Sequence, residues 1–136
     1  MSQETAYFGG GCFWNTELVF SKANGILGTE VGFCQPTKNG KQKLSKVEVV
    51  KIVFDDKLTT FIKLIDVFWV THNASNPSNQ NQKNIERSVL FYINEQQKNH
   101  AEVAVEAKNA QEKIYTTITS FDKYSRASDR DQHYYF

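Results

Sequence analysis

The chain has 136 residues, of which 40% are hydrophobic and 13% aromatic, and its 16 Lys and Arg against 15 Asp and Glu give a formal net charge of +1 at pH 7. This length is typical of one domain with its own core, so we expect a single domain over residues 1–136. The balanced charge excludes an electrostatic case for binding nucleic acid or a membrane. No signal-peptide pattern opens the sequence and no apolar run approaches the roughly 18 residues of a membrane span, which predicts a cytoplasmic protein.

Strand and helix signals alternate along the first half of the chain. The stretch "TAYFGG" is typical of a short strand that enters a Gly-rich turn, and the apolar spacing from Phe13 to about Lys22 predicts a helix starting at or just after Cys12. Two strands are predicted by "GILGTEVGFC" and "KVEVVKIVF", which are rich in β-branched and aromatic residues. Helical spacing in "LTTFIKLIDVFWVTH" predicts a core-facing helix, to which Leu58 contributes one turn before the main apolar stripe.

The second half continues with a buried strand in "RSVLFYI", an exposed helix in "EQQKNHAEVAVEAKNAQEK" and a late strand in "IYTTITSF". The order β-α-β-β-α-β-α-β excludes a regular doubly wound sheet, because the second and third strands follow one another without a helix. It predicts an α+β fold: a two-layer α/β sandwich of the ferredoxin-like, split βαβ kind, with a mixed sheet and extra C-terminal elements. The segments "QPTKNGKQKLS" and "NASNPSNQNQKN" are predicted surface loops.

One of the two cysteines lies in an unusual stretch, "YFGGGCFW", directly after three glycines. A thiol is nucleophilic as the thiolate, and a helix N-terminus favours an anion through its free N–H groups and its dipole. The glycines leave space for a substrate beside Cys12, and Phe13 and Trp14 would form an apolar wall. The same residues equally fit a tight turn followed by a small buried cysteine and core aromatics, so the pattern alone leaves both interpretations open.

The segment "GGGCFWNTELVF" closely resembles the GCFWGxE signature of the peptide methionine sulfoxide reductase A family, whose members reduce the S epimer of methionine sulfoxide. Further segments resemble family motifs in the same order, namely "GILGTEVGFCQP", "VEVVKIVFDD", "IDVFWVTHN" and "ERSVLFYINEQQK". Near the end, "ASDRDQHYY" keeps only Ala127, Gln132 and Tyr134 of the motif AExYHQxY. Several matches in register over nearly the whole chain are far more specific than one short motif.

The resemblance implies a role for each matched residue. Cys12 is the implied nucleophile that attacks the sulfoxide sulfur, and Phe13 and Trp14 match the aromatic pair that holds the methyl group. Glu48 matches the general acid that protonates the oxygen, a role that a pKa raised by desolvation would suit. On its pattern alone, Glu48 is more typical of an exposed residue on an alternating strand. The expected products are methionine and a sulfenic acid on Cys12, which another thiol must reduce.

The chain also departs from the family at positions that line the substrate pocket. Phe33 and Glu86 stand where the family has tyrosines, Asn81 falls at its aspartate, and Lys46 aligns with its histidine. Losing one donor that stabilises developing charge can cost about 10²–10³ in rate. The expectation is an active, thiol-dependent reductase that repairs oxidative damage. The alternative is a catalytically weakened or inactive relative that binds methionine sulfoxide without turnover.

Cys34 is the second thiol, and many family members resolve the sulfenic acid with a C-terminal cysteine that this chain lacks. Two hypotheses remain: Cys34 approaches Cys12 and resolves it through a disulfide, or Cys34 packs at a strand end. In the second case an external thiol such as thioredoxin, glutathione or dithiothreitol must act, and no bound cofactor is expected.

The remaining polar residues give weaker signals. His72, His100 and His133 lack cysteine or acidic neighbours at ligand spacing, so no metal site is expected. Arg87 matches a family position and fits either a structural ion pair or a role in the site. The expected partners are free methionine sulfoxide or oxidised proteins as substrate and a thiol reductant, and the expected oligomeric state is a monomer.

Overall fold

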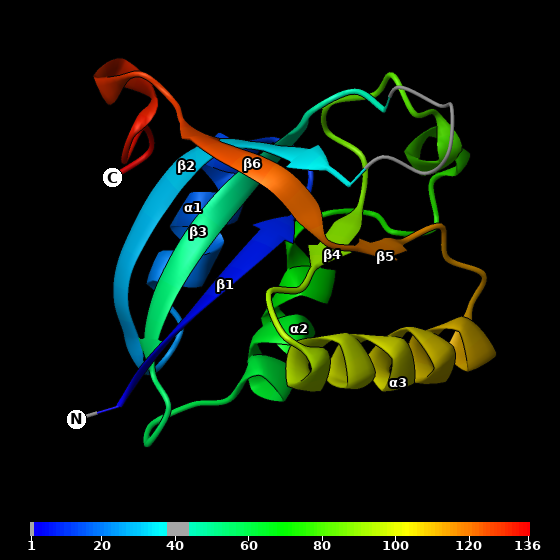
Figure 1. Ribbon diagram of the computed structural model, residues 1–136, viewed down its shortest axis with the longest axis horizontal. Helices are drawn as coiled ribbons and strands as arrows, with labels where there is room; N and C mark the ends of the chain where they lie inside the picture. The colour runs from blue at the N-terminus through cyan, green and yellow to red at the C-terminus, as the bar shows by residue number, and fades with distance from the viewer. Residues whose placement is uncertain (1, 38–43) are drawn as a thin grey trace.

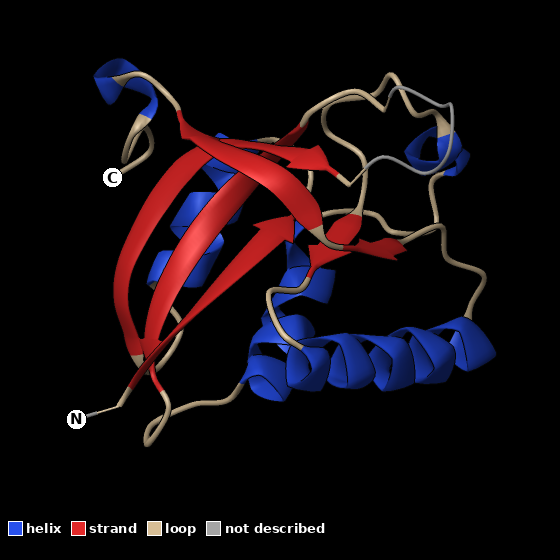
Figure 2. Cartoon of the chain, in the orientation of Figure 1, coloured by secondary structure: helices blue, strands red, loops and turns tan. Residues whose placement is uncertain are grey.

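The computed structural model describes residues 2–37 and 44–136, and over these residues the chain forms a six-stranded sheet with three α-helices (Figures 1 and 2). Two short 3₁₀ helices span Pro77–Gln80 and Asp129–Asp131. The other elements, in chain order, are β1 (Gln3–Gly9), α1 (Phe13–Ser21), β2 (Ile26–Pro36), β3 (Val47–Asp55), α2 (Phe61–Thr71), β4 (Val89–Phe91), α3 (Glu95–Gln111), β5 (Thr117–Thr119) and β6 (Phe121–Arg126).

The strand order in the sheet is β5-β4-β1-β3-β2-β6. Only β4 and β5 run parallel, and the other neighbours are antiparallel, so the sheet is mixed. The predicted α+β class is therefore confirmed. The predicted run of elements up to the long exposed helix is confirmed as well, with β4 shorter than its predicted segment.

The helices cover one face of the sheet and form the larger core with it. Alternate residues of β1 and β3 point to this face, where they meet apolar residues of all three helices. Rings of β1, α1 and α2 pack closely, and the Phe8 ring lies 4.8 Å from Phe20 and 5.8 Å from Phe68. This core holds α1 against the ends of β1 and β3, which positions the candidate site.

The C-terminal strands cover the opposite face. Only Ser120 separates β5 from β6, yet these strands pair with opposite edges of the sheet, so the segment crosses the face that the helices leave free (Figure 1). A second cluster lies beneath this crossing and includes Cys34, Val49 and Phe91. The predicted single late strand was wrong: residues 114–121 hold β5 and the first residue of β6, and β6 continues through the polar segment that follows. Most β6 side chains face solvent, which hides its strand pattern in the sequence.

Local capping explains where the helices begin. The Thr60 side chain accepts a hydrogen bond from the Lys63 N–H at the start of α2, and the Asn94 side chain does the same from Gln97 for α3. Leu58 was expected to extend the core face of α2, but it lies in the turn before this cap and is 53% exposed. The cap therefore ends the apolar stripe at Phe61.

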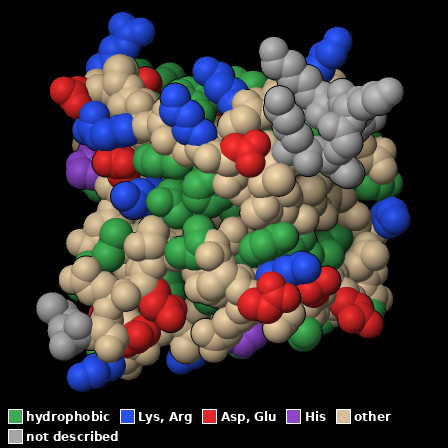
Figure 3. Space-filling model, in the orientation of Figure 1, with side chains coloured by type: hydrophobic (Ala, Val, Ile, Leu, Met, Phe, Trp, Pro, Cys, Tyr) green, Lys and Arg blue, Asp and Glu red, His purple; other side chains and the backbone are tan. Residues whose placement is uncertain are grey.

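The surface agrees with the balanced charge. Charged side chains of both signs intermingle with apolar ones over the face seen in Figure 3. None of the helices described is both long enough and apolar enough to cross a lipid bilayer.

Candidate active site

Cys12 lies at the N-terminal end of α1, where the Gly-rich turn leaves β1. It is the N-cap residue and half-buried, and its carbonyl accepts a hydrogen bond from the Thr16 N–H at 3.1 Å. Gly11 has φ +87°, and a Cβ on Gly10 would collide with Thr71 Oγ1, so this turn needs both glycines. The structure confirms the predicted helix start and puts the thiol at the positive end of the helix dipole.

Glu48 approaches this helix end from β3. Its Oε1 accepts a hydrogen bond from the Phe13 N–H at 3.2 Å, so the carboxyl group lies beside the residue that follows Cys12. Burial raises the pKa of Glu48, the charges of Glu86 and Asp131 raise it further, and the Phe13 hydrogen bond and Lys46 oppose the shift. Glu48 therefore keeps its proton to higher pH than an exposed glutamate, as a general acid requires.

Three aromatic side chains form the apolar wall of the site. The Phe13 ring lies 5.5 Å from Phe33 and 6.5 Å from Trp14, measured between ring centroids. They pack in one cluster with Val31 and Ala127. Phe33 pairs with Glu48 across β2 and β3, so this wall adjoins the carboxyl group. The structure thus brings the predicted nucleophile, acid and aromatic residues together.

Glu86 borders the site from the loop before β4. The Glu48 N–H donates to the Ile85 carbonyl at 2.7 Å, which brings this loop to the start of β3. Glu86 is exposed and helps to line a cavity of about 270 Å³ next to Gly11. Asn81, which aligns with the family's aspartate, instead accepts from the Lys83 N–H within its own turn and does not line this cavity.

Arg87 links the loop before β4 to the residues that precede β3. It is 1% exposed, and its guanidinium donates to the Asn84 carbonyl at 2.9 Å and to the Ser45 carbonyl at 2.8 Å. Burial lowers its pKa. Both bonds go to carbonyls and no salt bridge of Arg87 occurs within the described residues, so its predicted ion pair is not observed there.

The C-terminal tail packs against the aromatic wall. The Tyr134 ring stacks on Trp14 at 4.0 Å and 11°, and the Trp14 indole N–H donates to Asp131 Oδ1 at 3.2 Å. The Gln132 amide bonds both the N–H and the carbonyl of Val31. Sequence motifs pointed to Gln132 and Tyr134, whereas nothing in the pattern indicated that Asp131 reaches the site.

A buried carboxylate anchors the same tail. Glu17 is fully buried in α1, where it accepts hydrogen bonds from the Thr29 hydroxyl and from the His133 N–H, both at 2.8 Å. His133 has φ +53°, and this turn of the backbone directs Tyr134 and Tyr135 toward Trp14. The helix that carries Cys12 thus also fixes the end of the chain.

His72 supports the glycine turn from the end of α2. Its Nε2 lies 2.7 Å from Ser88 Oγ and its Nδ1 lies 2.9 Å from Thr71 Oγ1. Burial lowers the pKa of His72 to about 4, so the ring is neutral at pH 7. Within residues 2–37 and 44–136, no three His, Cys, Asp or Glu side chains gather as a metal site requires.

Cys34 lies on the other side of the sheet from this site. It follows Phe33 on β2, so the two side chains point to opposite faces, and Cys34 is fully buried with Val47 and Val49. Burial raises the pKa of its thiol. The burial of Cys34 on the opposite face of the sheet favours the packing alternative over a resolving disulfide.

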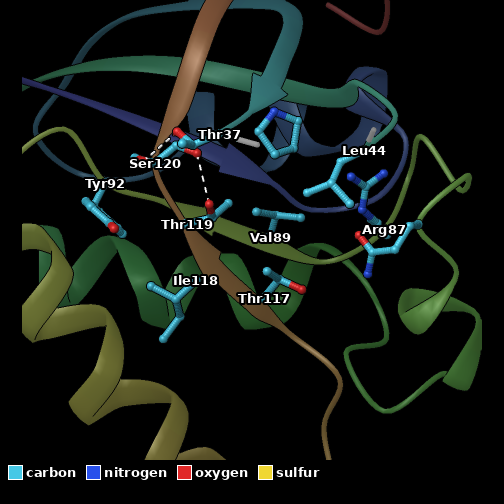
Figure 4. A pocket seen from close by; sticks show the side chains of 11 residues that line it. Thr37, Leu44, Arg87, Val89, Tyr92, Thr117, Ile118, Thr119 and Ser120 are labelled. Atoms are coloured by element: carbon cyan, nitrogen blue, oxygen red, sulfur yellow. Dashed lines mark hydrogen bonds between the residues drawn. The ribbon is translucent and has the colours of Figure 1, made fainter. Parts of the chain in front are cut away.

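A larger cavity of about 370 Å³ lies away from Cys12 (Figure 4). Hydroxyl groups of β5 and its neighbours face it, and Thr37 Oγ1 lies 2.7 Å from Ser120 Oγ. Arg87 lines this cavity from the opposite end, but Cys12, Glu48 and the aromatic wall do not. This cavity is therefore separate from the candidate active site.

Comparisons with known proteins match this chain to one protein family. The family described as peptide methionine sulfoxide reductase matches residues 4–136. The peptide methionine sulfoxide reductase MsrA of Methanococcus maripaludis is 36% identical over 143 residues, which cover 97% of this chain and 91% of that protein. Methionine sulfoxide reductase A of Corynebacterium diphtheriae superposes with a TM-score of 0.79 at 26% identity, covering 97% of this chain and 73% of that one.

A further solved structure shows the same fold in a complex. Mxr1 from Saccharomyces cerevisiae, solved in complex with Trx2, superposes with a TM-score of 0.70 at 22% identity. The match covers 95% of this chain and 84% of that one.

Proposed function

The chain belongs to the peptide methionine sulfoxide reductase family, and from this premise we propose how its own residues carry out the reaction. It is an oxidoreductase that reduces methionine sulfoxide at the expense of thiols. The alternative of a relative that binds methionine sulfoxide without turnover receives no support from these matches. We propose a role for each residue of the site, the epimer on which the protein acts and the thiol that reduces it.

Cys12 is the nucleophile. Its thiolate attacks the sulfur of the sulfoxide and forms an S–S bond while the oxygen is protonated. The hydroxyl group then moves to the Cys12 sulfur as the S–S bond and the original S–O bond break, which releases methionine as a neutral thioether and leaves a sulfenic acid on Cys12. The sulfoxide sulfur gains two electrons and the Cys12 sulfur loses two. Its half-buried position at the N-terminal end of α1, beside Glu48 and the aromatic wall, supports this role.

Glu48 is the general acid, and one observation carries the assignment. Its carboxyl oxygen lies 3.2 Å from the backbone nitrogen of Phe13, the first residue after Cys12. The pKa of Glu48, raised by burial, keeps a proton available for the oxygen that gains charge as the S–O bond breaks. A positioned acid of this kind contributes about 10²–10⁴ in rate.

Phe13, Trp14 and Phe33 hold the methyl group of the substrate, and Glu86 borders the more polar side of the pocket. The aromatic cluster beside Cys12 suits a small apolar group, whereas the cavity at Gly11 suits the polar backbone of the substrate. The S epimer is the proposed substrate, because the family resemblance includes the full Cys-Phe-Trp motif.

An external thiol completes the cycle. A first thiolate attacks the sulfenic sulfur and releases water, and a second thiolate attacks the mixed disulfide and restores Cys12. The burial of Cys34 on the opposite face of the sheet supports an external resolving thiol. Thioredoxin is the proposed reductant, since a protein of the same fold has been solved in complex with Trx2. We further propose that the chain acts as a monomer in the cytoplasm.

Reduction of the two separate epimers of N-acetyl methionine sulfoxide, driven by dithiothreitol, tests this function. We expect Cys12-dependent release of the thioether from the S epimer and only background release from the R epimer. Thioredoxin with its reductase should replace dithiothreitol. Equal rates for wild type and Cys12→Ser would overturn the assignment of Cys12.

A further inference from the structure

Phe33 leaves the substrate oxygen without a hydroxyl group on one side of the site. The ring lies against Phe13, and the residue pairs with Glu48 across the sheet, so Phe33 occupies a position next to both the nucleophile and the acid. A phenylalanine ring can pack against the substrate, but it cannot donate a hydrogen bond to the oxygen. Another donor near this ring would restore the missing interaction.

The Lys46 side chain lies over this ring. Its Nζ is 4.2 Å from the centroid of Phe33, the residue that pairs with Glu48 across β2 and β3. Within the described residues, no carboxylate oxygen lies within salt-bridge distance of Lys46, and residues 38–43, KNGKQK, contain no Asp or Glu. The ammonium therefore has donors available for a bound substrate.

We propose that Lys46 Nζ donates a hydrogen bond to the sulfoxide oxygen during the reaction, and so takes the place of the hydroxyl group that Phe33 lacks. This role rests on the proposed function of Cys12 and Glu48. The oxygen becomes more negative as the Cys12 sulfur attacks, and an ammonium stabilises this charge through a charge-assisted hydrogen bond. Glu48 supplies the proton that the oxygen retains, and Lys46 contributes only the hydrogen bond.

Two variants and a matched control test the role of the ammonium. With dithiothreitol and N-acetyl methionine S-sulfoxide, Lys46→Met should lower kcat about 10- to 100-fold with a smaller change in KM. Lys46→Arg, which keeps the charge, should retain more activity. Lys51→Met is the control, because Lys51 lies on β3, five residues after Lys46, and its Nζ also lies over an aromatic ring, that of Tyr124. A Lys46→Met rate within twofold of the Lys51→Met rate would overturn the proposal.

Restoring the hydroxyl group tests most specifically whether Lys46 replaces it. Phe33→Tyr in the Lys46→Met background should recover most of the lost kcat, since the two donors serve the same oxygen. A double variant as slow as Lys46→Met alone would show that the ammonium does not stand in for a hydroxyl. If wild type itself shows no Cys12-dependent turnover, the function of the site fails rather than the role of Lys46, so the two failures are distinguishable.

The pH profile separates a direct role from a structural one. The charged groups around Glu48 are Lys46, Glu86 and Asp131, with the Cys12 thiol on the adjacent helix end. Because Lys46 opposes the upward shift of the Glu48 pKa, Lys46→Met should move the alkaline limb of kcat/KM to higher pH. Phe33→Tyr in the Lys46→Met background should restore the rate but leave the alkaline limb at the higher pH, because a neutral hydroxyl does not replace the positive charge. An unmoved limb in Lys46→Met would contradict the proposal.

Discussion

The two cysteines of this chain lie in opposite environments. Cys12 is half-buried at the start of a helix, beside a carboxyl group and an aromatic wall. Cys34 is fully buried among apolar side chains beneath the crossing segment of β5 and β6. Burial raises the pKa of the Cys34 thiol.

We infer from this contrast that the surroundings of a thiol, rather than its presence, decide whether it reacts. A thiolate in an apolar cluster loses the hydration that stabilises its charge, whereas a helix N-terminus replaces that hydration with N–H groups. The alternation of side chains on β2 produces the difference, because Phe33 faces the site and the next residue faces away.

Replacing each cysteine in turn tests this contrast most directly. Cys12→Ser should lower reductase activity to the uncatalysed background, because the hydroxyl is a far weaker nucleophile. Cys34→Ala should keep activity within about threefold of wild type and lower the free energy of unfolding by about 1–2 kcal/mol through a small cavity. Turnover assays with dithiothreitol and urea unfolding measure both effects, and loss of turnover in Cys34→Ala would contradict the assignment.

Glu48→Gln should give the next largest effect. Removal of the acid lowers kcat/KM by about 10²–10⁴, and Glu106→Gln on the exposed face of α3 serves as the control. The raised pKa of Glu48 means that its ionised form destabilises the folded state above that pKa. Glu48→Gln should therefore be more stable than wild type at pH 8, with a smaller gain near pH 4. A less stable variant at pH 8 would be inconsistent with a buried, shifted carboxyl group.

His72 offers a test of the support beneath the glycine turn. Its folded-state pKa of about 4 lies below the ordinary 6.5, so the unfolded chain binds the proton first. Stability from this group is present above pH 6.5 and is lost as the pH falls toward 4, by about 3 kcal/mol at most. His72→Gln should remove this part of the pH dependence in thermal or urea unfolding. An unchanged slope would show that His72 titrates normally.

Asp131→Asn should have the smallest effect. The amide oxygen still accepts from the Trp14 indole, so the aromatic wall stays in place, but the charge that raises the Glu48 pKa disappears. The alkaline limb of kcat/KM should move to lower pH, and the maximal rate should change less than about threefold. A movement of the limb to higher pH would contradict the arrangement of charges.

The sequence predicted the elements whose patterns are local. The start of α1 followed from the glycines before Cys12, and α2 followed from its apolar stripe up to the cap at Thr60. The crossing of β5 and β6 could not be predicted, because most β6 side chains face solvent and the pairing of the two strands with distant edges depends on tertiary contacts.

In the site, too, short local motifs could be predicted from the sequence, whereas long-range contacts could not. Cys12, Phe13 and Trp14 form one short motif, and the register of β3 with the family placed Glu48 beside it. Asp131 reaches Trp14 only because the tail is fixed to α1 and β2 through His133 and Gln132. A contact between residues 117 positions apart leaves no local pattern in the sequence.

A single turnover followed by trapping of the thiols tests the central contrast most directly. Reduced protein is mixed with one equivalent of N-acetyl methionine S-sulfoxide without reductant, and a sulfenic acid reagent and then denaturing alkylation are followed by mass spectrometry. We predict the sulfenic acid adduct on Cys12 and an alkylated, unoxidised thiol on Cys34. A disulfide between Cys12 and Cys34, with no thiol left to alkylate, would contradict the account.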